Sequence, residues 1–204
     1  MLMHKKLCVL LATLTFAGAS VAQTSDAVPQ RVRGDIVSLQ GDVLTVHPLG
    51  GGAVPIEVKP DVTVSALKAV KLSDIKAGTY VGAPAIADPA GKLTASALLV
   101  FPEAARGTNE GHFAYDFGSN SSMTNANVDA VVTGASGREL KLSYKGGSNS
   151  VTMPENVPVV TFAPASRADL IAGKKVVVVV TKTAQGVLEA HVLFVEKDGV
   201  APPL

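Results

Sequence analysis

The side chains best suited to chemistry lie in one segment, residues 103–127, whose composition resembles nothing else in the chain. Glu110 and His112 are two residues apart, so on an extended strand their side chains would share a face and could reach one cation or polar ligand. Asp116 could supply a third ligand, while asparagine, water or backbone oxygen would have to complete a metal site. These residues therefore allow a divalent metal site as one hypothesis, although the sequence as a whole predicts no cofactor.

The same segment supports two other interpretations. Arg106 and His112, with Glu110, Tyr115 and Asp116 nearby, could bind a small molecule or an anion. Alternatively, residues 101–127 form a structural seam between two domains, because this stretch holds four of the nine aromatic residues. These are Phe101, Phe113, Tyr115 and Phe117. The last three alternate, so on an extended strand they would point to one side, and the sequence favours this seam over the two binding sites.

The remaining motifs fall short of known catalytic patterns. His47 and His191 stand on the less apolar phase of predicted strands, which indicates ordinary surface residues. The glycine-rich stretch 47–54 lacks the Lys-Ser/Thr pair of a phosphate-binding loop, and residues 134–137 (GASG) fall short of a nucleophile elbow. The sequence therefore predicts a protein that is not an enzyme.

The N-terminus predicts export. A basic start is followed by an apolar run over residues 7–17 and by Ser20-Val21-Ala22, the order of a secretory signal peptide cleaved after Ala22. An uncleaved anchor is the alternative, although the run is shorter than the roughly 20 residues that span a membrane. We expect a periplasmic location if the cell has an outer membrane, with no membrane span after cleavage.

Cleavage would remove the single cysteine, Cys8, so the exported chain would hold together without disulfides. It would also remove Lys5 and Lys6 but no acidic residue, which leaves sixteen basic against seventeen acidic side chains and a net charge of −1. This balance gives no general attraction to phosphate backbones, and we expect no nucleic-acid partner.

The chain contains two related units, residues 32–103 and 128–197. They align without a gap over their first twenty residues, from Val32 and Val128, and later match Asp74 with Asp169. Around the units stand a signal peptide (1–22), a polar lead-in (23–31), an aromatic-rich linker (104–127) and a tail (198–204).

Each unit alternates apolar and polar residues, as strands with one solvent-exposed face do. Val54, Ile56 and Val58 are the apolar positions of one such stretch. One short helix is expected in each, at residues 71–78 and 166–173. Five strands with a helix between the third and fourth is the order of an OB-fold barrel. The predicted fold is all-β, with two tandem OB-like five-stranded barrels. A single β-sandwich built from both units is the alternative.

Leu72, Asp74 and Gly78 form an L-x-D-x-x-x-G step that leads into YVGAPAI and a final strand, LTASALLV. This pattern resembles the OB-like domains of uncharacterised bacterial exported proteins. The resemblance implies a fold and a location, but no activity.

Together these observations predict an exported, non-enzymatic binding or scaffolding protein of the bacterial envelope, acting through its loops or through residues 103–127. Its partner would be an envelope protein or a small ligand. The alternative is a periplasmic metal-handling protein or enzyme centred on Glu110, His112 and Asp116.

Overall fold

The computed structural model describes residues 29–134 and 137–203. The predicted signal peptide, its cleavage site and most of the lead-in lie outside the described residues. No helix in the described part of the chain has the length and hydropathy needed to cross a bilayer.

The described residues form an all-β structure of fourteen strands with three single 3₁₀ turns. In the first half of the chain the strands are β1 (Gln30–Gln40), β2 (Val43–Pro48), β3 (Val54–Glu57), β4 (Thr63–Ala69), β5 (Tyr80–Ala87), β6 (Leu93–Ala95) and β7 (Leu98–Val100). In the second half they are β8 (Gly111–Ala114), β9 (Ser121–Gly134), β10 (Gly137–Tyr144), β11 (Gly147–Met153), β12 (Val159–Pro164), β13 (Lys175–Lys182) and β14 (Leu188–Val195).

A five-stranded mixed β-barrel confirms the general architecture expected from the alternation. β1 pairs antiparallel with β2 and β13, β2 pairs antiparallel with β3, and β13 pairs antiparallel with β14. A parallel contact between β14 and β3 closes the barrel. We call these five strands the first lobe. Its core holds side chains from every strand, including Ile36, Leu44, Ile56, Val178 and Leu193.

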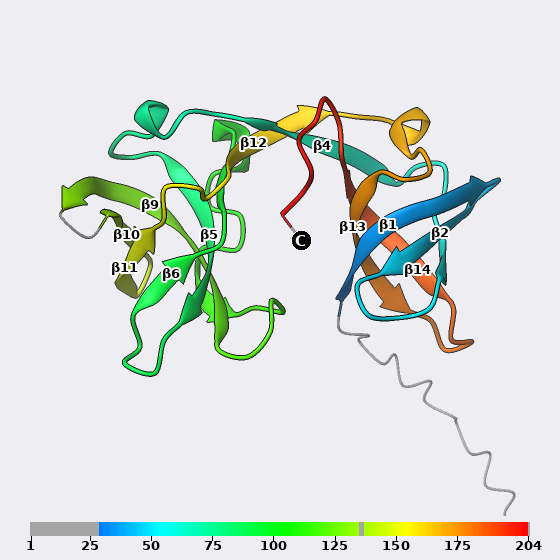
Figure 1. Cartoon of the computed structure of the whole chain (residues 1–204), viewed down its shortest axis with the longest axis horizontal. Helices are drawn as coiled ribbons and strands as arrows, with labels where there is room; N and C mark the ends of the chain where they lie inside the picture. The colour runs from blue at the N-terminus through cyan, green and yellow to red at the C-terminus, as the bar shows by residue number, and fades with distance from the viewer. Residues whose placement is uncertain (1–28, 135–136, 204) are drawn as a thin grey trace, which may run out of the picture.

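The nine other strands include a second group with the same order of neighbours, which we call the second lobe. β9, β10 and β11 pair antiparallel in sequence order, β11 pairs parallel with β6, and β5 pairs antiparallel with β6 and β9. This lobe has its own core, which includes Val81, Leu98, Val128, Leu140 and Val151. The two lobes stand side by side, with β4 and β12 running across the top (Figure 1).

The folded lobes do not follow the order of the repeats. The first lobe takes β1 to β3 from the first repeat and β13 and β14 from the second, whereas the second lobe takes β5 and β6 from the first repeat and β9 to β11 from the second. The prediction that each barrel forms from one contiguous unit is therefore wrong. Alternating burial shows which residues enter a core, but it does not distinguish between two similar cores.

Two strands carry the chain between the lobes. β4 pairs antiparallel with β12 over residues 65–69 and 160–164, with Leu67 opposite Phe162. The alignment that matches Asp74 with Asp169 also matches Leu67 with Phe162. The two residues that pair in space therefore occupy equivalent positions of the two repeats. An antiparallel pair of equivalent segments has local twofold symmetry. The repeats are therefore related by an approximate twofold axis through this crossover.

The ungapped alignment is wrong for the first strand of each unit. Gly173 N–H donates to the Ile36 carbonyl, and Gly78 N–H donates to the Val128 carbonyl, so Val128 corresponds to Ile36 and not to Val32. The reason is the longer β9–β10 hairpin, in which Val128 pairs with Leu142. With this correction, the pairing of β1 with β13 matches that of β9 with β5.

The expected helices are only single 3₁₀ turns. They are η1 (Leu72–Asp74) and η3 (Arg167–Asp169), and a further turn, η2, spans Glu103–Ala105. Ser166 and Asp169 form a reciprocal capping box at η3. Gly78 and Gly173 then take φ near +85°, and strands follow at once, so each segment is too short to nucleate an α-helix.

Candidate ligand-binding cleft

A chain of aromatic rings connects the two lobes. Tyr80 on β5 contacts Phe101, Phe101 contacts Phe162 on β12, and Phe162 contacts Phe194 on β14, with ring centroids 5.3, 5.7 and 5.8 Å apart. Gly82 makes room for this chain, because a Cβ atom there would lie 3.1 Å from the Phe101 ring. Phe101 therefore belongs to a chain of rings that spans the two lobes, and its ring neighbours, Tyr80 and Phe162, lie outside the predicted linker.

Part of the predicted linker is strand. Residues 111–114 form β8, which pairs with β9, and β9 itself starts at Ser121. Phe113 on β8 is 39% exposed. Tyr115 and Phe117 follow β8 in an edge-to-face contact, with ring centroids 5.4 Å apart. The expectation that all three rings fill one seam therefore does not hold for Phe113.

Tyr115 and Phe117 contact the first lobe through two arginines on β1. The Arg31 guanidinium lies 4.7 Å from the Tyr115 ring centroid, and the Arg33 guanidinium lies 4.8 Å from that of Phe117. Asp116, between the two rings, accepts bonds from Arg33 Nη2 at 2.7 Å and Nη1 at 3.0 Å. This two-pronged ion pair fixes the loop after β8 against the first lobe.

The ion pair lowers the pKa of Asp116. Burial acts in the opposite direction and is the largest single influence, because it raises the pKa of a carboxyl. Hydrogen bonds from Arg33, together with the attraction of Arg33 and Arg31, outweigh burial. The folded state therefore favours the charged carboxylate.

The other candidate residues are held by different partners. Arg106 donates to Glu103, to the Asn127 side chain and to the Gly78 carbonyl. Glu110 accepts a bond from the Lys145 N–H. His112 Nδ1 lies 2.8 Å from Thr124 Oγ1 and 2.9 Å from Asn149 Nδ2.

The structure therefore does not gather Glu110, His112 and Asp116 around one point. Among the residues that the structure describes, no three His, Cys, Asp or Glu side chains stand close enough to hold a metal ion. His47 and His191 are exposed.

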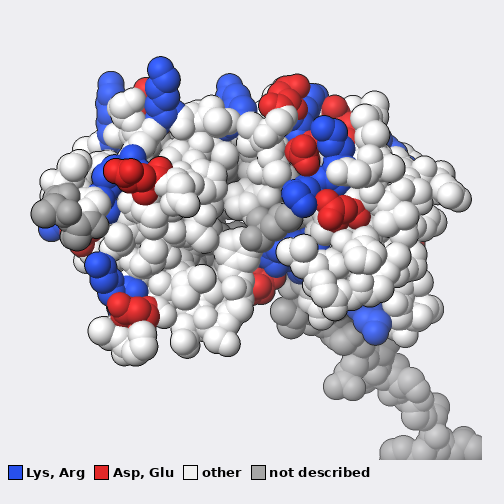
Figure 2. Space-filling view, viewed as in Figure 1, with Lys and Arg blue, Asp and Glu red and all other residues white. Residues whose placement is uncertain are grey.

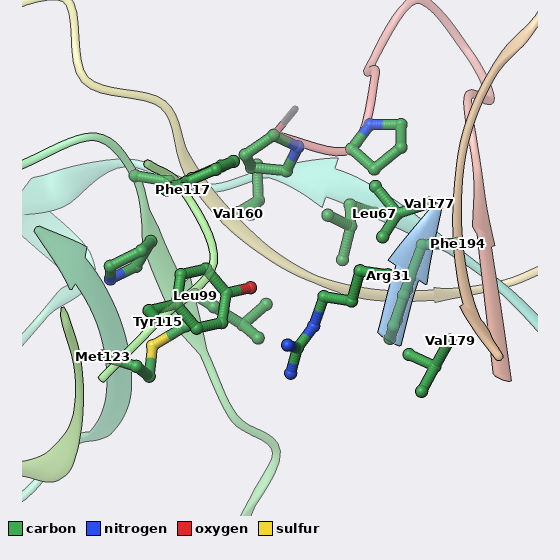
Figure 3. A pocket seen from close by; sticks show the side chains of 14 residues that line it. Arg31, Leu67, Leu99, Tyr115, Phe117, Met123, Val160, Val177, Val179 and Phe194 are labelled. Atoms are coloured by element: carbon green, nitrogen blue, oxygen red, sulfur yellow. The ribbon is translucent and has the colours of Figure 1, made fainter. Parts of the chain in front are cut away.

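A cleft lies between the two lobes beside the linker. Its volume is about 110 Å³. Both lobes, the crossover strands and the C-terminal segment line it: Arg31, Leu67, Pro84, Ala97, Leu99, Tyr115, Phe117, Met123, Val160, Val177, Val179, Phe194, Pro202 and Pro203. We call this space the interlobe cleft. Figure 3 shows the rings of Tyr115 and Phe117 on one side and Val177, Val179 and Phe194 on the other.

The valine run on β13 explains the apolar wall of the cleft. Val176, Val178 and Val180 are fully buried in the first lobe, while Val177 and Val179 line the cleft on the opposite face of the strand. Five consecutive valines predict a strand that is covered on both faces. This run was the one local signal that could have revealed the cleft.

The C-terminal segment also enters the cleft. Pro202 is buried and, with Pro203, forms part of the lining. The last described residues therefore contribute to the cleft, although the sequence analysis assigned them to a tail outside both units.

No protein-family model, curated protein or solved structure matches this chain. The resemblance to OB-like domains of exported proteins is supported only as far as a five-stranded mixed barrel in an all-β fold, and no family is identified.

Truncation of Phe101 and of Phe113 to alanine distinguishes a ring packed between the lobes from a partly exposed one. We expect Phe101→Ala to lower the free energy of unfolding by about 3 kcal/mol, because the ring packs between Tyr80 and Phe162. We expect Phe113→Ala to cost about 1 kcal/mol or less, because that ring is already partly solvated. Urea unfolding of both variants measures the difference. Equal losses would contradict this placement of the seam.

The Asp116 ion pair predicts a specific dependence on pH. Because the folded pKa is lowered, the stabilisation is present above the unfolded pKa of about 3.9 and is lost as pH falls through the folded value. Asp116→Asn should lower the melting temperature by about 2–4 °C at pH 7, and the gap to wild type should narrow below about pH 4. Asp61→Asn, at an exposed site without an ion pair among the described residues, is the control. A constant gap from pH 7 to pH 3 would be inconsistent with the ion pair.

Proposed function

We propose that the protein is an exported, non-enzymatic binding protein of the bacterial envelope and that the interlobe cleft is its ligand site. The observation that carries this proposal is the cleft's lining, which is apolar except for Arg31 and is drawn from both lobes. Small-molecule sites are usually apolar clefts with a few polar groups, often located between domains. We further propose that the second lobe, like the first, forms a closed OB-like barrel.

The size of the cleft suggests a small apolar group. A cavity of about 150 Å³ lined by aliphatic and aromatic side chains can hold benzene, and the interlobe cleft is of similar scale at about 110 Å³. A ligand larger than one ring would extend beyond the cavity. The linker contributes Tyr115 and Phe117 to the lining, which agrees with the expectation that residues 103–127 take part in binding.

The charge distribution supports a small ligand over a polyanion. Figure 2 shows basic and acidic side chains interspersed on the face displayed, without an extended patch of one sign. Nucleic-acid binding relies on clustered positive charge. The alternative of a metal site centred on Glu110, His112 and Asp116 has no observation in its favour, because each of these residues already binds a different partner.

A neutral aromatic probe tests the cleft. We expect 2-phenylethanol to bind with a Kd of about 1 mM, given the affinity that so small a ligand can reach. Backbone amide NMR shifts should saturate at Leu99, Val177 and Val179. Val179→Phe should weaken binding at least about tenfold by filling the cavity, whereas Val132→Phe, at an exposed position outside the cleft, should bind as wild type. Non-saturating shifts scattered over the surface, or unchanged binding in Val179→Phe, would refute the proposal.

A further inference from the structure

Two cations share one carboxylate at the edge of the interlobe cleft. Both oxygens of Asp116 already accept close bonds from Arg33, at 2.7 and 3.0 Å. Arg31 Nη1 reaches the same Oδ1 atom at 3.4 Å, a distance that gives only a weak hydrogen bond. Among the described residues, Arg31 has no other carboxylate within ion-pair distance. This group of three side chains therefore carries one excess positive charge.

The excess charge lies on a side chain that faces the cleft. Arg31 is the one charged residue among the described side chains that line the cavity, and its side chain is 34% exposed. Figure 3 shows it extending from β1 into the cavity, with the guanidinium group toward Tyr115. The contact with the Tyr115 ring, 4.7 Å from the centroid, restrains the guanidinium without using its N–H donors on a carboxylate.

We propose that the interlobe cleft binds a small amphipathic monocarboxylate, with its apolar body against Leu99, Val177 and Val179 and its carboxylate on Arg31. This inference rests on the proposed function and specifies its ligand class. An arginine fork matches the two oxygens of a carboxylate, and one cation in an otherwise apolar lining complements one negative charge. The cavity volume fits an apolar body of about one phenyl ring or a chain of about four to six carbons.

A matched pair of probes tests the carboxylate. Phenylacetate and 2-phenylethanol share the same carbon skeleton and differ in the charge of the terminal group. At pH 7 we expect the full chain to bind phenylacetate about tenfold more tightly than 2-phenylethanol, measured by amide NMR titration. Arg31→Gln should remove this preference, so that the variant binds the two probes with equal affinity. Saturable amide shifts at Leu99, Val177 and Val179 with 2-phenylethanol show that the variant keeps its cleft. Lys141→Gln, an exposed change of equal charge on β10, should retain the preference.

The outcomes separate this inference from the proposed function. Equal affinity for the two probes in wild type, or a preference that survives in Arg31→Gln, would overturn the carboxylate assignment while leaving the cleft as a binding site. Failure of both probes to bind at the cleft would overturn the proposed function as well. Loss of the preference in Lys141→Gln as well as in Arg31→Gln would show that net charge, and not Arg31, selects the anion, and would also overturn the assignment.

Discussion

The antiparallel pairing of β4 with β12 is the constraint on which the rest of the structure depends. These strands leave the third strand of each repeat and meet at Leu67 and Phe162, which occupy the same position in the two repeats. Because the strands extend across the molecule, β13 and β14 of the second repeat complete the lobe that the first repeat begins, and β5 and β6 of the first repeat complete the other lobe. The arrangement is that of a strand-exchanged dimer whose two subunits are joined in one chain.

The exchange makes the two halves of the chain mutually dependent. Each core contains side chains from both repeats, so neither repeat buries its apolar residues without the other. A barrel of about 70 residues without disulfides is only marginally stable, and sharing two cores and a crossover enlarges the cooperative unit. The exchange also fixes the lobes beside each other, which positions β13 and the loop after β8 on opposite walls of the interlobe cleft.

Local sequence predicted strands within each repeat, but it missed β8 and did not identify which strands pair. Alternation correctly marked Ile56 and Val58 as buried, and the valine run indicated a strand with two covered faces. No local sequence pattern indicates the exchange of strands between the lobes, because the two repeats present similar apolar residues to similar cores. For the candidate site too, the sequence indicated some of the residues but not their partners. Tyr115 and Asp116 stood out by their type, whereas Arg31 fell in a supposed lead-in and reaches Asp116 across 85 residues of chain.

The exchange itself is tested most directly by disulfide trapping in a Cys8→Ser background. Val32 on β1 lies opposite Val178 on β13, whereas contiguous barrels would place Val32 beside β5, where Ala83 is the residue that matches Val178. Directly paired residues in antiparallel strands lie close enough for a disulfide. The exchanged fold predicts that mild oxidation cross-links Val32→Cys/Val178→Cys within one chain and leaves Val32→Cys/Ala83→Cys reduced, as read by mass spectrometry. A cross-link in the second pair and none in the first would contradict it.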